Sequence, residues 1–387
     1  MLTFSGPAGR RLALAVVSMI TFSIRAEAGQ DSIKESLISV TNQAWAGQTP
    51  GIQVGLWVPG HGEWKIALGL ADIKRNLPMR IGMQQPIGSI TKTMTASLIL
   101  QLVEEGKLSL DDRLSKWYPS APEGDQITVA MLLNMTSGIA DYLQGYFFRS
   151  FPETLVRNPH FVFQHELIAS YGLSLPRVFQ DPGSEYAYSN TNTILLGEIA
   201  EKVTGKRYER LLSERLFRPL GMRRTFLAQR GGLRAPFTHL YYADEVSDRL
   251  IDTTQWSTSE AWAAGGVAST LDDAHRWAIA LGTGRGILGS RMQTLRGESC
   301  GPEINGNDPN SSARYCLGVI VMRDRRSGRI TSYSHTGAIF GAQAFLSYDT
   351  KRGAVVVVLA NGSSLDMSVA TRTFEKIVDA LPQFFSH

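Results

Sequence analysis

The amino-acid sequence predicts an α/β fold of the α+β type, in which an antiparallel sheet is flanked by helices and carries an inserted, mainly helical lobe. Two observations predict it. Short runs of β-branched and aromatic residues, typical of strands, occur near both ends of the chain, whereas residues 111–256 have mostly helical patterns. The simplest arrangement pairs the strands from both ends of the chain in one sheet. With 387 residues, the chain is long enough for two such parts.

The first 28 residues have the features of a secretory signal peptide. Arg10 and Arg11 supply positive charge, the next 13 residues are mostly apolar, and Ala26-Glu27-Ala28 fits a cleavage site. The apolar stretch is too short to span a bilayer comfortably. We therefore expect an exported protein, periplasmic or extracellular. A membrane anchor that is never cleaved is the alternative.

The predicted elements of the N-terminal part follow from local patterns. Residues 31–46 have the apolar spacing of a helix. Residues 51–58 and 63–71 have the pattern of two strands joined by a turn that contains Pro and Gly. Residues 89–105 form a strongly apolar helical run. We expect residues 29–110 to form the first part of a sheet domain.

Strand-like runs return after the helical domain that we expect at residues 111–256. Residues 257–387 then complete the sheet domain and end in a closing helix. The Asp-Thr-Lys-Arg-Gly segment between the last two strands is a hairpin signal. The predicted strands are residues 314–322, 330–334, 343–348 and 354–359, the hairpin turn is 349–353, and the helix is 364–380.

Composition and charge exclude several classes of protein. Apolar residues make up 43% of the chain and charged residues 19%, which is typical of a globular protein. The net charge is +4, and it falls to +2 without the signal peptide, which holds three Arg and one Glu. This balance argues against nucleic acid as a partner. Two cysteines and seven scattered histidines form no metal-binding pattern. After the signal peptide, no stretch is long and apolar enough to span a membrane.

The two cysteines, Cys300 and Cys316, flank a stretch rich in Gly, Asn, Pro and Ser. In an oxidising compartment they can close this loop as a disulfide, worth roughly 3 kcal/mol by chain-entropy arguments. Two free thiols in a reducing compartment are the alternative.

One lysine stands out by its surroundings. Between Ile81 and Val103, Lys92 is the single charged residue among 23. Burial without a paired anion lowers the pKa of a lysine, which then acts as a base near neutral pH. Ser89 lies three residues earlier, on the same helical face and at the predicted first turn. A hydroxyl beside a desolvated amine is what an activated serine nucleophile needs. The alternative is an ordinary serine that caps the helix, because the sequence pattern Ser-x-x-Lys is common.

Two further segments carry side chains suited to chemistry. Tyr188-Ser189-Asn190 follows a Pro-Gly turn and precedes a helical run. A tyrosine hydroxyl relays a proton if a nearby cation lowers its pKa, and an asparagine binds an amide through both its donor and its acceptor. His335-Thr336-Gly337 lies at the end of the predicted strand 330–334, where Thr336 and a protonated His335 can bind a carboxylate. Taken separately, each segment fits an ordinary loop or strand end equally well.

The order and separation of these three motifs resemble the serine penicillin-recognising hydrolases, the β-lactamase and DD-peptidase superfamily. Tyr188 lies 99 residues after Ser89, and His335 lies 147 residues after Tyr188. The resemblance covers nearly all of the chain after the signal peptide and implies a β-lactamase/transpeptidase-like fold. It also implies a small-molecule or peptide substrate and no metal or organic cofactor.

The resemblance implies a role for each motif residue. Ser89 attacks a carbonyl group and forms an acyl-enzyme, while Lys92 and Tyr188 share the proton transfers. Asn190 orients the substrate amide. The backbone N–H groups of Ser89 and Ala338 form the oxyanion hole. His335 and Thr336 hold a substrate carboxylate, beside Gly337.

Two features of the motifs narrow the expected activity. Tyr188 at the second motif is similar to class C β-lactamases and their peptidase and esterase relatives. His335 stands where most β-lactamases carry Lys, and we expect it to be partly charged at neutral pH. We therefore expect an exported D-alanyl-D-alanine carboxypeptidase-type hydrolase that acts on cell-wall peptides or related D-amino-acid amides. A class C-like β-lactamase, a short-chain esterase and a slowly acylating penicillin-binding sensor are the alternatives.

Overall fold

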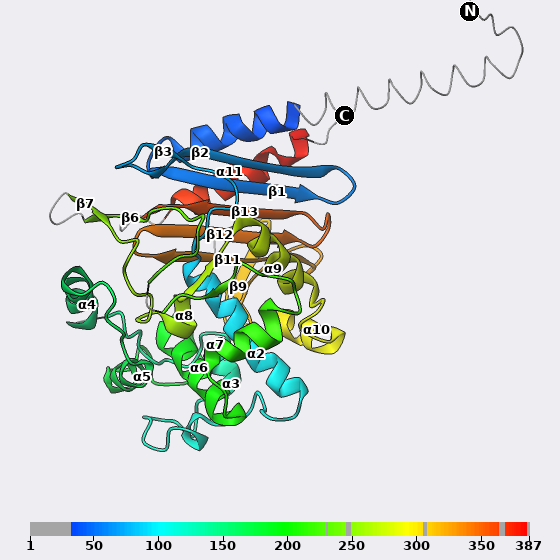
Figure 1. The fold of residues 1–387 in the computed structure, drawn as a ribbon. Helices are drawn as coiled ribbons and strands as arrows, with labels where there is room; N and C mark the ends of the chain where they lie inside the picture. Colours follow the sequence, from blue (N-terminus) through cyan, green and yellow to red (C-terminus); the bar gives the residue numbers. More distant parts are fainter. Residues whose placement is uncertain are drawn as a thin grey trace, which may run out of the picture.

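The structure is a computed structural model that describes residues 32–144, 146–229, 231–244, 249–304, 308–363 and 368–384 (Figure 1). The expected signal peptide lies outside these residues. Residues 32–45 form a helix, as predicted. In the part of the chain that the structure describes, no helix combines the length and the apolar character needed to cross a membrane.

The centre of the fold is an eight-stranded antiparallel sheet with the order β3-β2-β1-β13-β12-β11-β10-β9. β1 pairs with β13, so strands from the two ends of the chain meet in the middle of the sheet, as predicted (Figure 1). The predicted fold class is therefore confirmed. The strands are β1 (Gly51–Val58), β2 (Gly62–Asp72), β3 (Leu77–Pro78), β9 (Ser311–Tyr315), β10 (Ile320–Asp324), β11 (Ile330–Ile339), β12 (Ala342–Asp349) and β13 (Val355–Ala360).

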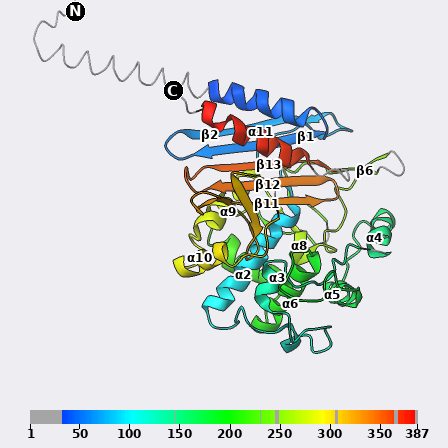
Figure 2. The same cartoon turned by 180° about the vertical axis from the view of Figure 1, so that it is seen from behind.

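Helices cover both faces of this sheet. Every residue of β13 is buried, and successive side chains of a strand point to opposite faces. Val356 and Val358 pack with the helix over residues 32–45 and with α11 (Val369–Phe384), which crosses the face seen in Figure 2. Val355 and Val357 belong to the core on the other face, which includes α9 (Leu271–Thr283).

Most other helices gather beyond the second face, around α2, which runs away from the sheet (Figure 1). The division into a sheet domain and a helical domain at residues 111 and 256 stays a prediction. These helices are α2 (Thr91–Glu104), α3 (Val129–Leu133), α4 (Tyr146–Arg157), α5 (His165–Ser174), α6 (Asn190–Thr204), α7 (Tyr208–Leu212), α8 (Trp262–Gly265) and α10 (Ser290–Glu298), with short turns η1 (Gly88–Ile90), η2 (Leu114–Lys116) and η3 (Ser213–Phe217).

The predicted elements differ from the structure in two places. The single run predicted at residues 314–322 is two strands, β9 and β10, because the chain reverses at Gly318, whose φ is +78°. The mainly helical stretch also contains short strands. Among them, β6 (Tyr241–Asp244) pairs with β7 (Arg249–Asp252) and with β14 (Gly362–Ser363), a partner distant in sequence. A second small sheet joins β4 (Gln85–Pro86), β8 (Val267–Ser269) and β5 (Phe226–Leu227).

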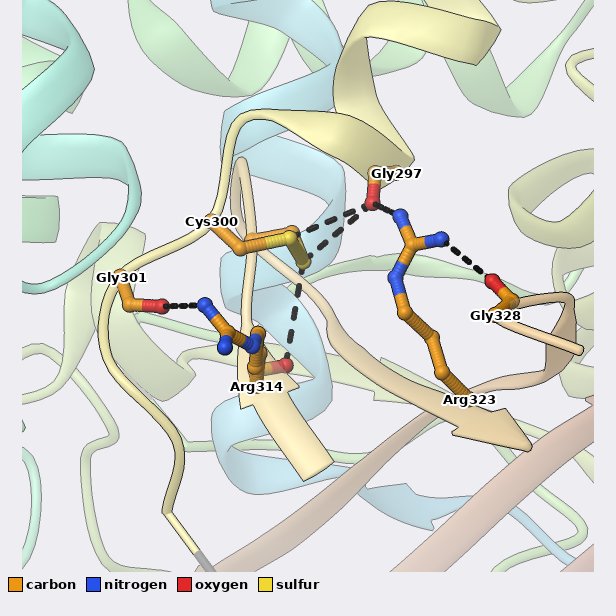
Figure 3. The surroundings of a disulfide bond; sticks show 7 residues. Gly297, Cys300, Gly301, Arg314, Arg323 and Gly328 are labelled. Atoms are coloured by element: carbon orange, nitrogen blue, oxygen red, sulfur yellow. Dashed lines mark hydrogen bonds between the residues drawn. A yellow bond between two sulfur atoms is a disulfide. The ribbon is translucent and has the colours of Figure 1, made fainter. Parts of the chain in front are cut away.

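Cys300 and Cys316 are joined in a disulfide with a Cα–Cα distance of 3.8 Å (Figure 3). The bond ties the chain just after α10 to the chain just after β9. Both sulfur atoms lie beside the carbonyl oxygen of Gly297, which also accepts a hydrogen bond from Arg323 (Figure 3). The disulfide therefore links the end of α10 to the end of β9, the strand at one edge of the sheet.

Candidate active site

Ser89 lies in η1, directly before α2, at a point where the backbones of η1 and β11 touch. Gly88 has a φ of +51°, and a Cβ atom at this position would come within 2.5 Å of the Ala338 nitrogen. A Cβ atom at Gly337 would come within 2.0 Å of the Ile87 carbonyl oxygen. Only glycine at both positions permits this approach. The backbone of Ala338 is thereby brought beside the start of η1, as an oxyanion hole formed with Ser89 requires.

Lys92 is fully buried on the first turn of α2, as the uncharged sequence around it predicted. Its Nζ atom lies 2.9 Å from the Ser89 Oγ, 2.6 Å from the Asn190 Oδ1 and 2.7 Å from the Ala264 carbonyl oxygen. Burial lowers the pKa of Lys92 to about 7, and the negative charge of Asp141 partly opposes this shift.

The three contacts of Lys92 define which way a neutral amine faces. The oxygens of Asn190 and Ala264 accept hydrogen bonds and have no hydrogen to donate. They therefore take the two N–H bonds of the neutral amine. The lone pair is left facing the Ser89 hydroxyl, which donates to it. This is the geometry of a general base beside its nucleophile.

Tyr188 is hydrogen-bonded to the Ser89 hydroxyl. Its ring centroid is 5.0 Å from the Lys92 Nζ. The condition that a nearby cation lowers the pKa of this tyrosine is not met. Burial of the phenol outweighs the hydrogen bond and raises the pKa well above its usual value. Tyr188 is thus a protonated hydroxyl that can donate a proton when one is needed.

Asn190 is the first residue of α6, and both ends of its side-chain amide are occupied. The oxygen accepts from Lys92, and the Nδ2 atom donates to the Asp141 Oδ2 over 2.7 Å. Asp141 holds the amide with its oxygen toward Lys92. Burial raises the pKa of Asp141. The sequence did not reveal this acid, because it lies 49 residues after Lys92 and the nearest acids in sequence are different ones.

His335 lies on β11 and is buried, with both ring nitrogens occupied. Its Nδ1 atom is 2.5 Å from the Thr336 carbonyl oxygen, so Nδ1 carries the hydrogen. Its Nε2 atom then accepts from the Tyr315 hydroxyl, 3.0 Å away. Burial lowers the pKa of His335 to about 3. The lowered pKa contradicts the expectation of a partly charged His335 at neutral pH, while the role of His335 and Thr336 in holding a carboxylate stays a prediction.

One cavity of about 490 Å³ brings the three motifs together. Ser89, Tyr188 and Asn190 line it, and so do the residues from His335 to Ala338. Much of its wall is aromatic, and among the described residues that line it there is no Lys or Arg and a single acid, Glu260. No cluster of three metal-binding side chains occurs in the described residues. The aromatic lining residues are Tyr142, Phe151, Tyr186, Tyr188, Tyr242, Tyr315 and Phe340.

Comparisons with known proteins show what the whole chain is similar to. A family model described as Beta-lactamase matches residues 37–378. D-aminopeptidase from Brucella anthropi is 31% identical over 230 residues, which are 59% of this chain and 42% of that protein. The D-alanyl-D-alanine-carboxypeptidase/endopeptidase AmpH from Escherichia coli (strain K12) is 29% identical over 277 residues, 68% of this chain and 66% of AmpH. The match thus spans less than two thirds of either relative.

Solved structures share the whole fold. A D-stereospecific amidohydrolase from a Streptomyces species superposes with a TM-score of 0.76 at 27% identity, covering 88% of this chain and 97% of that one. A D-amino acid amidase from Ochrobactrum anthropi SV3 has a TM-score of 0.76 at 23% identity, covering 90% of this chain and 99% of that one. The second likeness concerns the fold alone.

Proposed function

Because this chain belongs to the beta-lactamase family, whose members are serine hydrolases, we propose that it cleaves amides of D-amino acids through an acyl-enzyme at Ser89. One observation carries the proposal. Ser89 opens into an aromatic cavity whose described lining residues include no Lys or Arg, and in which His335 is neutral. A terminal carboxylate, as in a D-Ala-D-Ala peptide, finds no cation there. An uncharged amide with an apolar side chain fits this lining.

In the proposed reaction Lys92 takes the proton of Ser89 while the Ser89 oxygen attacks the substrate carbonyl carbon. The N–H groups of Ser89 and Ala338 bind the resulting oxyanion. When the C–N bond breaks, Tyr188 gives its proton to the leaving nitrogen and regains one from Lys92. Water then attacks the ester carbonyl and loses a proton to Lys92, and the Ser89 oxygen leaves and takes this proton from Lys92.

Asn190 has two roles in the proposed reaction. Lys92 and Asp141 each occupy one hydrogen-bonding position of its amide, which leaves one N–H and one oxygen lone pair to bind the substrate amide. Asn190 also positions the Lys92 amine. The Asp141 carboxylate fixes the orientation of Asn190 by accepting a hydrogen bond from its Nδ2 atom. Thr336 and Gly337 remain at the cavity wall, where they contact the substrate.

The names of two relatives favour D-configured substrates, since one is a D-aminopeptidase and another is a D-stereospecific amidohydrolase. We propose that the protein is exported to the periplasm or the cell exterior, which agrees with the disulfide between Cys300 and Cys316. Its partner is then a small amide or peptide.

A substrate panel tests the proposed function. The purified protein is supplied with D-phenylalanine amide, L-phenylalanine amide, D-alanine amide, a D-Ala-D-Ala peptide, a chromogenic cephalosporin and a short-chain aryl ester. We expect the highest kcat/KM for D-phenylalanine amide. This kcat/KM should exceed the value for D-alanine amide by roughly tenfold or more, because the aromatic wall buries the larger side chain.

Each other outcome of the panel identifies a rival activity. If kcat/KM is highest for the D-Ala-D-Ala peptide, the protein is a carboxypeptidase. If it is highest for the cephalosporin, the protein is a β-lactamase. Hydrolysis of the ester and of no other substrate would indicate an esterase. Covalent labelling by a fluorescent penicillin with no turnover of any substrate would indicate a sensor. All four results contradict the proposed function.

A further inference from the structure

We propose that Glu260 binds the α-ammonium group of the substrate, so that the enzyme selects D-amino-acid amides with a free amino group. This inference rests on the proposed function and deepens it. In such a substrate the amino group is on the carbon next to the scissile carbonyl. A receptor for it must therefore lie in the cavity that holds Ser89.

Glu260 is placed in that cavity by the segment before and within α8. Glu260, Ala261, Ala264 and Gly265 all line it. The carbonyl oxygen of Ala264 is bound by Lys92, so this segment reaches the catalytic amine directly. The hydroxyl of Tyr142, another lining residue, donates to the Glu260 carbonyl oxygen over 2.6 Å. The wall that carries Glu260 is thus fixed at both ends.

The carboxyl group of Glu260 is buried, with only 3% of the residue exposed. One of its oxygens, Oε2, has no hydrogen-bond partner among the described residues. Among the described residues, its hydrogen bonds come from the backbone of Glu260 and Ala261, and burial raises its pKa to about 8. A buried acid without a cation costs folding free energy, so its presence calls for an explanation.

Charge complementarity supplies that explanation. Among the described lining residues Glu260 is the single acid, and neither Lys nor Arg is there to pair with it. With a pKa of about 8, the free carboxyl group is protonated at neutral pH. A bound substrate ammonium lowers this pKa, so the group loses its proton to solvent and accepts a charge-assisted hydrogen bond. A substrate with a carboxylate in the same place meets no cation. The cavity thus favours a cationic ligand over an anionic one.

The test compares D-phenylalanine amide with N-acetyl-D-phenylalanine amide, in which the amine is blocked. We expect the wild type to prefer the free amine. In Glu260→Gln the KM for D-phenylalanine amide should rise roughly tenfold or more, because a charge-assisted hydrogen bond is lost. The kcat/KM for the acetylated amide should change by less than about threefold, and Glu260→Asp should restore part of the preference.

Two controls separate this role from a structural one. Glu185→Gln removes an exposed carboxylate next to the lining residue Tyr186, and it should leave the preference for the free amine unchanged. The melting temperature of Glu260→Gln should equal or exceed that of the wild type, because the substitution removes an unpaired buried acid. If Glu260→Gln does not fold, Glu260→Asp and the protection experiment below decide.

The second measurement does not depend on turnover. D-phenylalanine amide should protect Ser89 of the wild type from a fluorescent penicillin at a lower concentration than its N-acetyl derivative does. An equal protective concentration, or an unchanged preference in Glu260→Gln, overturns the role of Glu260 and leaves the proposed function standing. A wild type that hydrolyses neither amide but is labelled by the penicillin overturns the proposed function itself, and the inference with it.

Discussion

Replacing Ser89 with Ala is expected to lower kcat for D-phenylalanine amide by roughly 10⁴-fold or more, because the variant has no oxygen to form the acyl-enzyme. Covalent labelling by a fluorescent penicillin should vanish in the same variant. The fold should persist, since Ser89 is partly exposed at the cavity and the substitution deletes one oxygen. Steady-state kinetics, gel fluorescence and thermal melting measure the three effects.

The matched control is Ser120→Ala, which changes an exposed serine that is not part of the cavity lining. This variant should keep wild-type turnover and labelling. Full labelling of Ser89→Ala would show that another residue is the nucleophile. The mass of the labelled peptide would then identify that residue.

Replacing Lys92 with Met is expected to lower kcat/KM by roughly 10²- to 10⁴-fold, the usual contribution of a general base. Methionine keeps the length of the buried side chain but has no lone pair for the proton of Ser89. Two buried oxygens, those of Asn190 and Ala264, lose their donor, while the cost of burying the amine disappears. These effects oppose each other, so the variant should remain folded.

The lowered pKa of Lys92 also predicts how kcat/KM and stability change with pH. Because the pKa of Lys92 is lowered to about 7, the wild-type kcat/KM should fall as the pH drops below that value and the amine takes a proton. Lys92 should add stability as the pH rises from about 7 to 10.5, because the unfolded chain still binds a proton at this lysine and the folded chain does not. The raised pKa of Glu260 opposes this rise below about pH 8. Lys92→Met should lose that rise, and Lys107→Met, at an exposed lysine, should retain it. Rapid acylation of Ser89 in Lys92→Met would contradict the role of Lys92 as a base.

The sequence predicted those parts of the molecule that depend on neighbours along the chain. The β-branched run of β13 and the alternating pattern of β1 are local, and they suffice for a sheet built from both ends. The burial of Lys92 was predictable for the same reason, since the residues around it are uncharged for a long stretch. The contact between Ser89 and Lys92 was also predictable, because residues three apart lie on the same side of a helical turn.

The parts that the sequence did not predict depend on contacts between distant residues. Asp141 reaches Lys92 only through Asn190, on another helix. His335 is neutral because the fold buries its ring, which a His-Thr-Gly motif does not reveal. The chain has 35 Asp and Glu residues, and nothing in the sequence distinguishes Glu260 from the others. Only the fold shows that it lines the cavity.

The most direct test of this account is the pKa of one amine. In protein labelled with carbon-13 at lysine Cε, the Lys92 resonance is assigned by its absence from Lys92→Met and is followed by NMR from pH 5 to 11. We predict a midpoint at about 7, and a lower one in Asp141→Asn, because the Asp141 charge raises the pKa of Lys92. A midpoint near the ordinary lysine value of 10.5 would mean that Lys92 is charged at neutral pH and does not activate Ser89.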